Sequence, residues 1–483
     1  MTQRLGLNLT KDEFLQALDS VSQATRSRAV IFVDALNESE DRTVWKNRLA
    51  GILTTLSRYP RVGLAASIRT SYEGAVVPEG LVPDRLVRET HYGFADHEFQ
   101  ATRTFFDHYG LERPSVPLLV PEFQNPLFLK LFCEGLSNRG LTRVPLGIRG
   151  ITAVFDFFVG SVNEKLSAPD ALDFDESSRP VQQLSKLMAD SGSTWLSREE
   201  AREAANGILL QEGYARSLFR HLISEGILAE NLIPGEDGEW RDGVHFSYER
   251  FSDHLIAAYL LEEHLDRSDP SRSFSEDQPL GSLVEDERAC WRNRGLIEAL
   301  SVQVPENTGK ELIEVVTGAV KYRPVCEAFI ESLLWRDPAS ITDATLDHVN
   351  ACLDRPGILN QLLDVLLTLA ASPGHPYNAE FLHERLMRDS LPERDSWWSI
   401  FLHYQYDTQG SVDRLVDWAW SPEDKDHIDD EAVRLCGVAL AWFFTSSNRF
   451  LRDRATKALV NLLDERIHVL RELIPKFLKV YDP

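Results

Sequence analysis

Two carboxylates follow an apolar run near the start of the chain, at a spacing that could support nucleotide chemistry. Ala29-Val30-Ile31-Phe32-Val33 is rich in β-branched residues, Asp34 comes directly after it, and Glu38 follows four positions later. A buried parallel strand that ends in a carboxylate can present it to a nucleotide-bound Mg²⁺, which is the pattern of a Walker B strand. We therefore predict that Asp34 is a magnesium ligand at the end of a buried strand.

A second apolar run supplies a basic residue at a comparable place. Residues 61–68 (Arg-Val-Gly-Leu-Ala-Ala-Ser-Ile) favour another buried strand, and Arg69 follows it. Helical spacing of apolar residues predicts helices over 11–24 and 43–59. A strand, a helix and a strand with short connections form a βαβ unit with parallel strands. If the two strands are neighbours, Asp34 and Arg69 emerge at the same carboxyl edge, where open α/β sheets bind ligands.

The chain lacks the other half of such a site. No GxxxxGK[ST] sequence occurs in it, and only 28 residues precede Ala29. The backbone amides of that loop cradle the phosphates, and its lysine neutralises them. Two explanations follow: the chain is the C-terminal part of a longer protein, or it is a degenerate relative that no longer hydrolyses ATP.

Composition narrows the class of protein. The chain has 483 residues, 43% of them hydrophobic, and a net charge of −24. The negative charge disfavours a nucleic-acid coat, because phosphate binding needs clustered Lys and Arg. Five scattered cysteines without a CxxC pair predict reduced core thiols. No apolar run approaches 18 residues and no signal segment follows Met1, so we expect a cytoplasmic protein without a membrane span.

The rest of the chain is expected to be mostly helical. A hairpin over about 226–247 follows several helices in a winged-helix pattern, and a strong amphipathic helix is predicted over 251–265. From about residue 269 no strand signal recurs, which favours a stacked α-solenoid. The helices expected before the solenoid are 98–109, one that opens at Pro126, 154–166, 180–189, 197–206 and 215–225. The prolines expected to separate helices within the solenoid are Pro305, Pro324, Pro338, Pro356, Pro373, Pro392 and Pro422.

Four segments in this order resemble the STAND class of signalling ATPases, close to its NACHT and antiviral (AVAST) branch. They are Asp34-Ala35-Leu36-Asn37-Glu38, Ala66-Ser67-Ile68-Arg69-Thr70-Ser71, Asn125-Pro126-Leu127-Phe128-Leu129 and the run from Phe246 to Ala258. The resemblance covers residues 1 to about 265, with a helical array behind. It implies a mostly α protein with a partial α/β component: a remnant of a P-loop NTPase sheet, a winged-helix domain and a C-terminal α-solenoid. The implied domains are 1–95, 96–145 (helical), 146–268 (winged helix) and 269–483 (HEAT- or TPR-like repeats).

The resemblance also implies roles for single residues. Asp34 would hold Mg²⁺, Glu38 would orient the attacking water, and Arg69 would face the terminal phosphate as sensor 1. Asn37, Pro126 and Tyr248 would contact the nucleotide, ATP or ADP with Mg²⁺, once a P-loop is supplied; without one, no cofactor is expected. Asn37 and Tyr248 depart from the family, which has an acidic pair at the first place and often a His at the second.

Each of these residues also has a plainer interpretation. Asp34 could be an ordinary turn residue after a strand, and Glu38 an acid at a helix N-terminus. Arg69 could be a solvated strand end, and Pro126 suits the first position of any helix. The Trp397-Trp398 and Trp418-Ala419-Trp420 clusters favour solenoid core over a contact surface.

Three functions follow from these alternatives. The first is the STAND switch implied by the resemblance: the repeats sense a foreign, viral protein, and the ATP-bound form oligomerises in antiviral defence. The second is a catalytically inactive scaffold whose helical repeats bind protein partners. The third, a transcription regulator, is disfavoured because residues 145–265 hold about twice as many acidic as basic residues.

Overall fold

The computed structural model describes residues 9–33, 36, 43–68, 77, 87–89, 91, 93–94, 97–138, 140–144, 151–168, 172, 174, 176, 178–209, 217–234, 240–353 and 356–480. The chain divides into two compact units. The first holds residues 1–91 and 230–244, and the second holds residues 92–229 and 245–483.

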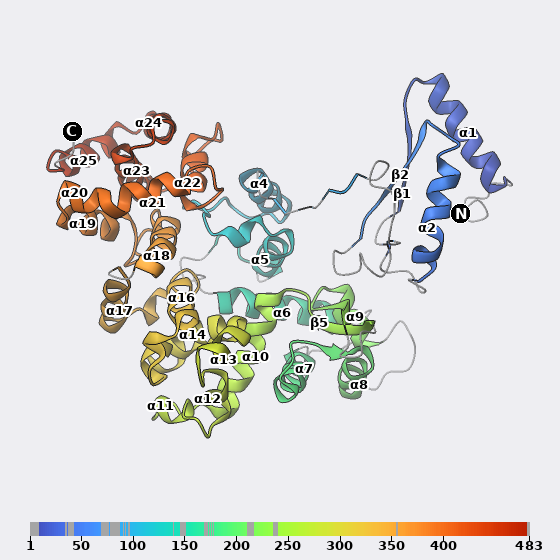
Figure 1. The fold of residues 1–483 in the computed structure, drawn as a ribbon, viewed down its shortest axis with the longest axis horizontal. Coiled ribbons are helices and arrows are strands. Elements are labelled where there is room, and N and C mark those ends of the chain that lie inside the picture. Colours follow the sequence, from blue (N-terminus) through green and yellow to red (C-terminus); the bar gives the residue numbers. More distant parts are fainter. Residues whose placement is uncertain are drawn as a thin grey trace. The chain divides into compact units, whose positions relative to one another are not determined.

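The first unit contains a small parallel sheet (Figure 1). Its elements are α1 (Lys11–Ala24), β1 (Ala29–Val33), α2 (Thr43–Leu56) and β2 (Val62–Ala66). The strands pair in parallel from Ala29 opposite Val62 to Val33 opposite Ala66. The prediction of two neighbouring parallel strands is therefore confirmed.

The helix α1 begins with a capping box. The Thr10 side chain accepts a hydrogen bond from the Glu13 N–H, and the Glu13 carboxylate accepts one from the Thr10 N–H. This capping box satisfies two backbone donors at the helix start, where no carbonyl of the helix itself can reach them. The helix then turns Leu15 into a small cluster with Leu56 of α2 and Val62 of β2.

Strand β1 is covered on one face only, which corrects the prediction of a buried strand. Ala29 and Ile31 pack against the cluster of Leu15, Leu56 and Val62. Val30 and Phe32, on the opposite face, are 43% and 77% exposed. An apolar run shows that the side chains on both faces of a strand are suited to burial. It does not show that other elements pack against both faces, and for β1 they pack against one.

Helices and a three-stranded sheet follow along the chain. The elements are α4 (Glu98–His108), η4 (Pro121–Gln124), α5 (Pro126–Asn138), α6 (Ile151–Ser167), α7 (Ser178–Ser191), β3 (Leu196–Ser197), α8 (Arg198–Ile208), α9 (Leu218–Ser224), β4 (Leu228–Pro234), β5 (Trp240–Phe246) and α10 (Glu249–His264). Most of β4 and β5 belongs to the first unit, and the other elements belong to the second. The strand order is β3-β5-β4. Helix α8 begins with a capping box, in which the Ser197 and Glu200 side chains each accept the other residue's backbone N–H.

Beyond Phe246, all the regular secondary-structure elements of the described residues are helices. They are α11 (Pro270–Ser273), α12 (Pro279–Leu283), α13 (Glu287–Arg292), α14 (Arg294–Thr308), α15 (Leu312–Val315), η6 (Ala319–Lys321), α16 (Arg323–Ser332), η7 (Pro338–Ser340), α17 (Asp343–Leu353), α18 (Pro356–Leu369), α19 (Ala379–Arg388), α20 (Leu391–Arg394), η8 (Asp395–Ser399, a π-helix), α21 (Ile400–Gln405), α22 (Ser411–Trp420), α23 (Asp430–Trp442), η9 (Phe443–Thr445), α24 (Arg449–Leu463) and α25 (Ile467–Phe477).

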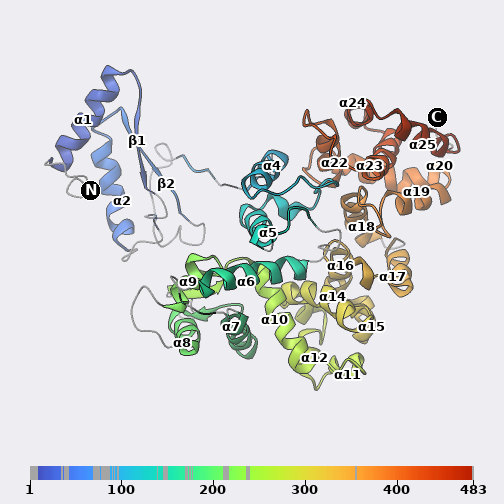
Figure 2. The ribbon, with the colours of Figure 1, turned by 180° about the vertical axis from the view of Figure 1, so that it is seen from behind.

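These helices pack in an ordered series (Figure 2). Helix α14 packs on α16, α16 on α18, α18 on α22, and α22 on α24. A second row runs from α19 to α23 to α25. One continuous apolar core joins the series, from Leu300 through Leu363 to Ala458. The expectation of a mostly helical chain with a partial α/β part is confirmed at this level.

One proline departs from the expected pattern of helix breakers. Pro324, Pro338, Pro356 and Pro392 lie at the starts of helices, where a missing N–H costs nothing. Pro305 instead lies inside α14, whose last residue is Thr308. The prediction that Pro305 separates two helices was therefore wrong, because the helix continues for three residues beyond it.

The burial of the cysteines and of two tryptophans agrees with the predictions that these residues lie in the core. All five cysteines are buried and none forms a disulfide. Trp398 is fully buried and Trp418 nearly so, as core packing requires, whereas Trp420 is 42% exposed. None of the described helices has the length and apolar character needed to cross a bilayer.

Candidate functional site

The carboxyl ends of β1 and β2 lie side by side in the first unit. The Ser67 N–H donates to the Val33 carbonyl over 3.0 Å, and the Leu36 N–H donates to the Ser67 carbonyl over 3.0 Å. The parallel pairing thus continues up to the sheet edge where a ligand site is expected. Asp34, Asn37, Glu38 and Arg69 lie outside the described residues.

Pro126 is the first residue of α5, as the sequence predicts. Directly before it, the Asn125 side-chain oxygen accepts hydrogen bonds from the N–H groups of Leu127 (2.9 Å) and Phe128 (3.3 Å). Asn125 therefore caps the helix while Pro126 fixes its first turn. The cap positions Phe128, whose side chain is almost fully buried.

Tyr248 lies close to this first turn although it is 122 positions away from Pro126 in sequence. It precedes α10 directly, and its ring centroid is 6.1 Å from that of Phe128 and 6.2 Å from that of Phe155 in α6. Burial, and next the charge of Glu122, raise the pKa of the Tyr248 phenol. Tyr248 is therefore a neutral aromatic group near neutral pH, and through Phe128 the structure brings it together with the helix that Pro126 opens.

Arg250, two residues further, is surrounded by carboxylates from three other elements. Its Nη2 lies 3.2 Å from Glu122 of η4, 3.5 Å from Glu331 of α16 and 3.9 Å from Glu298 of α14. Its guanidinium also lies over the ring of Trp335, 5.1 Å from the ring centre. A planar guanidinium can serve several carboxylates and an aromatic face together, which a lysine ammonium cannot.

The carboxylates outnumber the positive charge at this junction. Burial raises the pKa of Glu122 to about 7, and the Arg250 charge offsets this only in part. Burial, and next the charges of Glu249 and Glu298, raise the pKa of Asp253 to about 7. Both carboxyl groups therefore change protonation near neutral pH.

Asp253 is held against the first turn of α14. A Cβ atom at Gly295 would lie 2.0 Å from the Asp253 Oδ2 atom, so a larger residue at this position would displace the Asp253 carboxylate. The next residue, His254, is buried, and burial lowers its pKa to about 3, so its imidazole is neutral. The Gln303 side-chain amide of α14 donates to the His254 carbonyl over 2.8 Å.

The Arg250 ion pairs join α10 to η4, α14 and α16. Within the described ranges, no group of three or more His, Cys, Asp or Glu residues could hold a metal ion. No role is predicted from the sequence for Arg250, Glu122 or Asp253, although Arg250 and Asp253 lie in the Phe246–Ala258 segment. The signal in the sequence was that Arg250 and Asp253 are charged residues beside an apolar helix face. Their partners could not be inferred, because these lie up to 128 positions away.

The comparisons with known proteins add no family to this description. No protein-family model matches the chain, and no curated protein matches it.

Proposed function

We propose that this chain is the C-terminal part of a STAND-type ATPase switch. The observation that carries the proposal is the parallel register of β1 and β2, which ends both strands at one edge directly before Asp34 and three residues before Arg69. In this proposal Asp34 holds Mg²⁺, Glu38 orients water and Arg69 faces the terminal phosphate, while Asn37, Pro126 and Tyr248 contact the nucleotide.

Two further observations support the proposal. The uncovered face of β1, with Val30 and Phe32, fits a sheet that has lost a covering layer. The element order α7-β3-α8-α9-β4-β5 with strand order β3-β5-β4 is the order of a winged helix. In the proposed switch the helices after residue 269 bind a protein ligand, viral in the defence role, and the ATP-bound form oligomerises in the cytoplasm.

Calorimetric titration with ATP and ADP in the presence of Mg²⁺ tests this proposal. The chain would be compared with the same chain extended by its natural upstream residues. We expect nucleotide binding only with the extension, and its loss in Asp34→Ala. Asp12→Ala, on the exposed start of α1, is the matched control and should bind as the unmodified protein does.

The second candidate is a scaffold that binds protein partners through its helices and binds no nucleotide. The continuous core of the helical series favours it, because that part is complete without a nucleotide domain. An extended chain that binds neither ATP nor ADP would contradict the switch and support the scaffold.

A further inference from the structure

The β4–β5 hairpin is divided between the two units. Residues 230–244 belong to the first unit, whereas Ala229 and His245 on either side of them belong to the second. The base of the hairpin is anchored in the second unit, because the Ser247 N–H donates to the carbonyl of the fully buried Ile227 over 2.9 Å. The far part of the hairpin therefore packs in one unit while its base is fixed in the other.

Leu232 of this far part belongs to an apolar cluster at the carboxyl ends of β1 and β2. The centre of the cluster is Leu36, which is 3% exposed, and the side chains packed against it are Val33, Trp45, Ile68 and Leu232. Leu232 is 196 positions away from Leu36 in sequence, so the contact is made by the tertiary fold. The hairpin thus contacts the sheet edge at which a ligand site is expected.

The contact lies next to the residues proposed to bind nucleotide. Leu36 lies between Asp34 and Glu38 in sequence, two positions from each. Ile68 directly precedes Arg69. A contact that holds Leu36 restricts the positions that residues two away along the chain can take, because the span of so short a segment is limited. The hairpin therefore acts on the segment that carries the proposed Mg²⁺ ligand.

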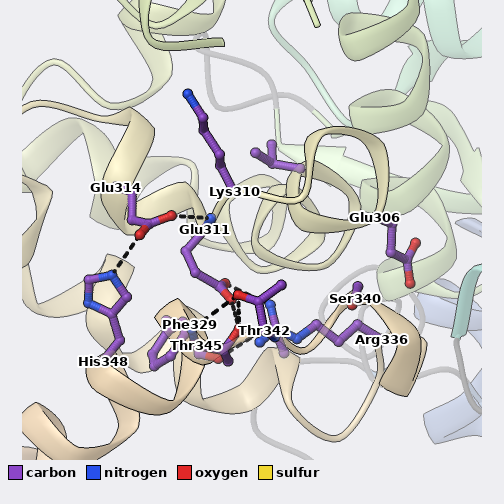
Figure 3. A network of polar contacts seen from close by, with 12 residues as sticks. Glu306, Lys310, Glu311, Glu314, Phe329, Arg336, Ser340, Thr342, Thr345 and His348 are labelled. Atoms are coloured by element: carbon purple, nitrogen blue, oxygen red, sulfur yellow. Dashed lines mark hydrogen bonds and ion pairs between the residues drawn. The ribbon is translucent and has the colours of Figure 1, made fainter.

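The Leu232 contact is easier to release than the polar contacts within the helical series. In that series the fully buried Arg336 donates from Nη1 to the Glu311 carboxylate over 2.6 Å, and the Thr345 hydroxyl donates to the other Glu311 oxygen (Figure 3). Separating such a pair leaves buried charges without partners. Leu232 is half-buried among apolar side chains and leaves no charge behind when it moves away. The hairpin is therefore suited to opening while the helical series stays packed.

We propose that residues 230–234 and 240–244 form a strap over the carboxyl edge of the β1–β2 sheet, held closed by Leu232 in the Leu36 cluster. The inference rests on the proposed nucleotide binding at this edge and adds how that binding is regulated. The closed strap slows the release of bound nucleotide, and withdrawal of Leu232 allows nucleotide exchange. Because the base of the hairpin belongs to the second unit, a movement of that base reaches Leu232 through the two strands.

Hydrogen exchange on the unmodified chain tests the closing contact without nucleotide. Leu232→Ser should speed exchange of the Leu36 and Ser67 amides, which are hydrogen-bonded at the sheet edge, by about tenfold. Leu232→Met keeps an apolar side chain of similar volume and should exchange as the unmodified protein does. Trp240→Ser, at the half-exposed start of β5, is the matched control and should change neither amide. Unchanged exchange in Leu232→Ser would overturn the strap.

Release of nucleotide tests the regulation. The chain extended by its natural upstream residues would be loaded with fluorescent N-methylanthraniloyl-ADP and Mg²⁺, and then mixed with excess unlabelled ADP. We expect release about tenfold faster in Leu232→Ser and unchanged in Leu232→Met and Trp240→Ser. Bound ADP that leaves Leu232→Ser at the unmodified rate would overturn the strap and leave the proposed function standing. An extended chain that binds no ADP would contradict the proposed function and, with it, the regulation of release.

Discussion

The two-stranded sheet near the start of the chain and the helical series after residue 269 differ in how completely they cover their apolar residues. In the sheet, Ile31 is packed while its neighbour Phe32 is 77% exposed. In the helical series, one core extends from Leu300 to Ala458. Both regions have apolar sequence. In the helical series the apolar residues are buried by neighbouring helices, whereas one face of β1 has no described element packed against it.

The largest effect is expected in the helical core. Trp398 is fully buried and donates from its indole to the Thr445 hydroxyl over 3.1 Å. Trp398→Ala should lower the free energy of unfolding of this region by about 3–5 kcal/mol, because it leaves a large cavity. Urea unfolding followed by circular dichroism measures it, and a loss below about 1 kcal/mol would mean that this core is loosely packed.

Arg250 tests whether the polar junction belongs to the same rigid region. Arg250→Met keeps most of the side-chain volume but leaves Glu122 and Glu331 without their positive partner. We expect a loss of about 2–3 kcal/mol at pH 8, less than for a fully buried pair because Arg250 is partly exposed. Urea unfolding at pH 8 and pH 5 is the measurement, and the loss should shrink at pH 5 as the carboxyl groups become protonated.

The Glu122 carboxyl group should make stability depend on pH. Its pKa is raised to about 7 in the folded chain, so the folded state binds more protons than the unfolded state below pH 7. Glu122 therefore costs stability as the pH rises from about 4.5 through 7. Relative to the unmodified protein, Glu122→Gln should gain about 2–3 kcal/mol between pH 5 and pH 8.

The pH dependence of the free energy of unfolding of the unmodified protein does not report on Glu122 alone. The lowered pKa of His254 works in the opposite sense, since its stability contribution is lost as the pH falls through 6.5 toward 3. The difference between Glu122→Gln and the unmodified protein cancels the His254 contribution. A difference that stays constant with pH would show that Glu122 is not the group that titrates.

The smallest effect is expected on the open face of the sheet. Phe32→Ser should change the free energy of opening of β1 by less than about 0.5 kcal/mol, because the side chain loses little burial. Ile31→Ser, on the covered face, is the matched control and should cost about 1–3 kcal/mol. Hydrogen exchange of β1 peptides measures both, and equal losses would show that the face carrying Phe32 is covered after all.

The sequence predicted those features that depend on neighbouring residues. The bounds of α1 and β1 follow from a local capping box and an apolar run. The Tyr248–Phe128 contact and the carboxylates around Arg250 could not be predicted, because packing joins residues more than 40 positions apart. The exposure of Phe32 was also beyond prediction, since an apolar run does not show which layer covers it.

Hydrogen exchange with and without nucleotide tests the central claim, that β1 and β2 form part of a nucleotide-binding sheet. The chain extended by its natural upstream residues would be compared with and without Mg²⁺-ADP. We expect at least about tenfold slower exchange in residues 29–33 and 62–66 and in the peptide containing Tyr248, with α18 unchanged. Unchanged exchange in both strands would contradict it.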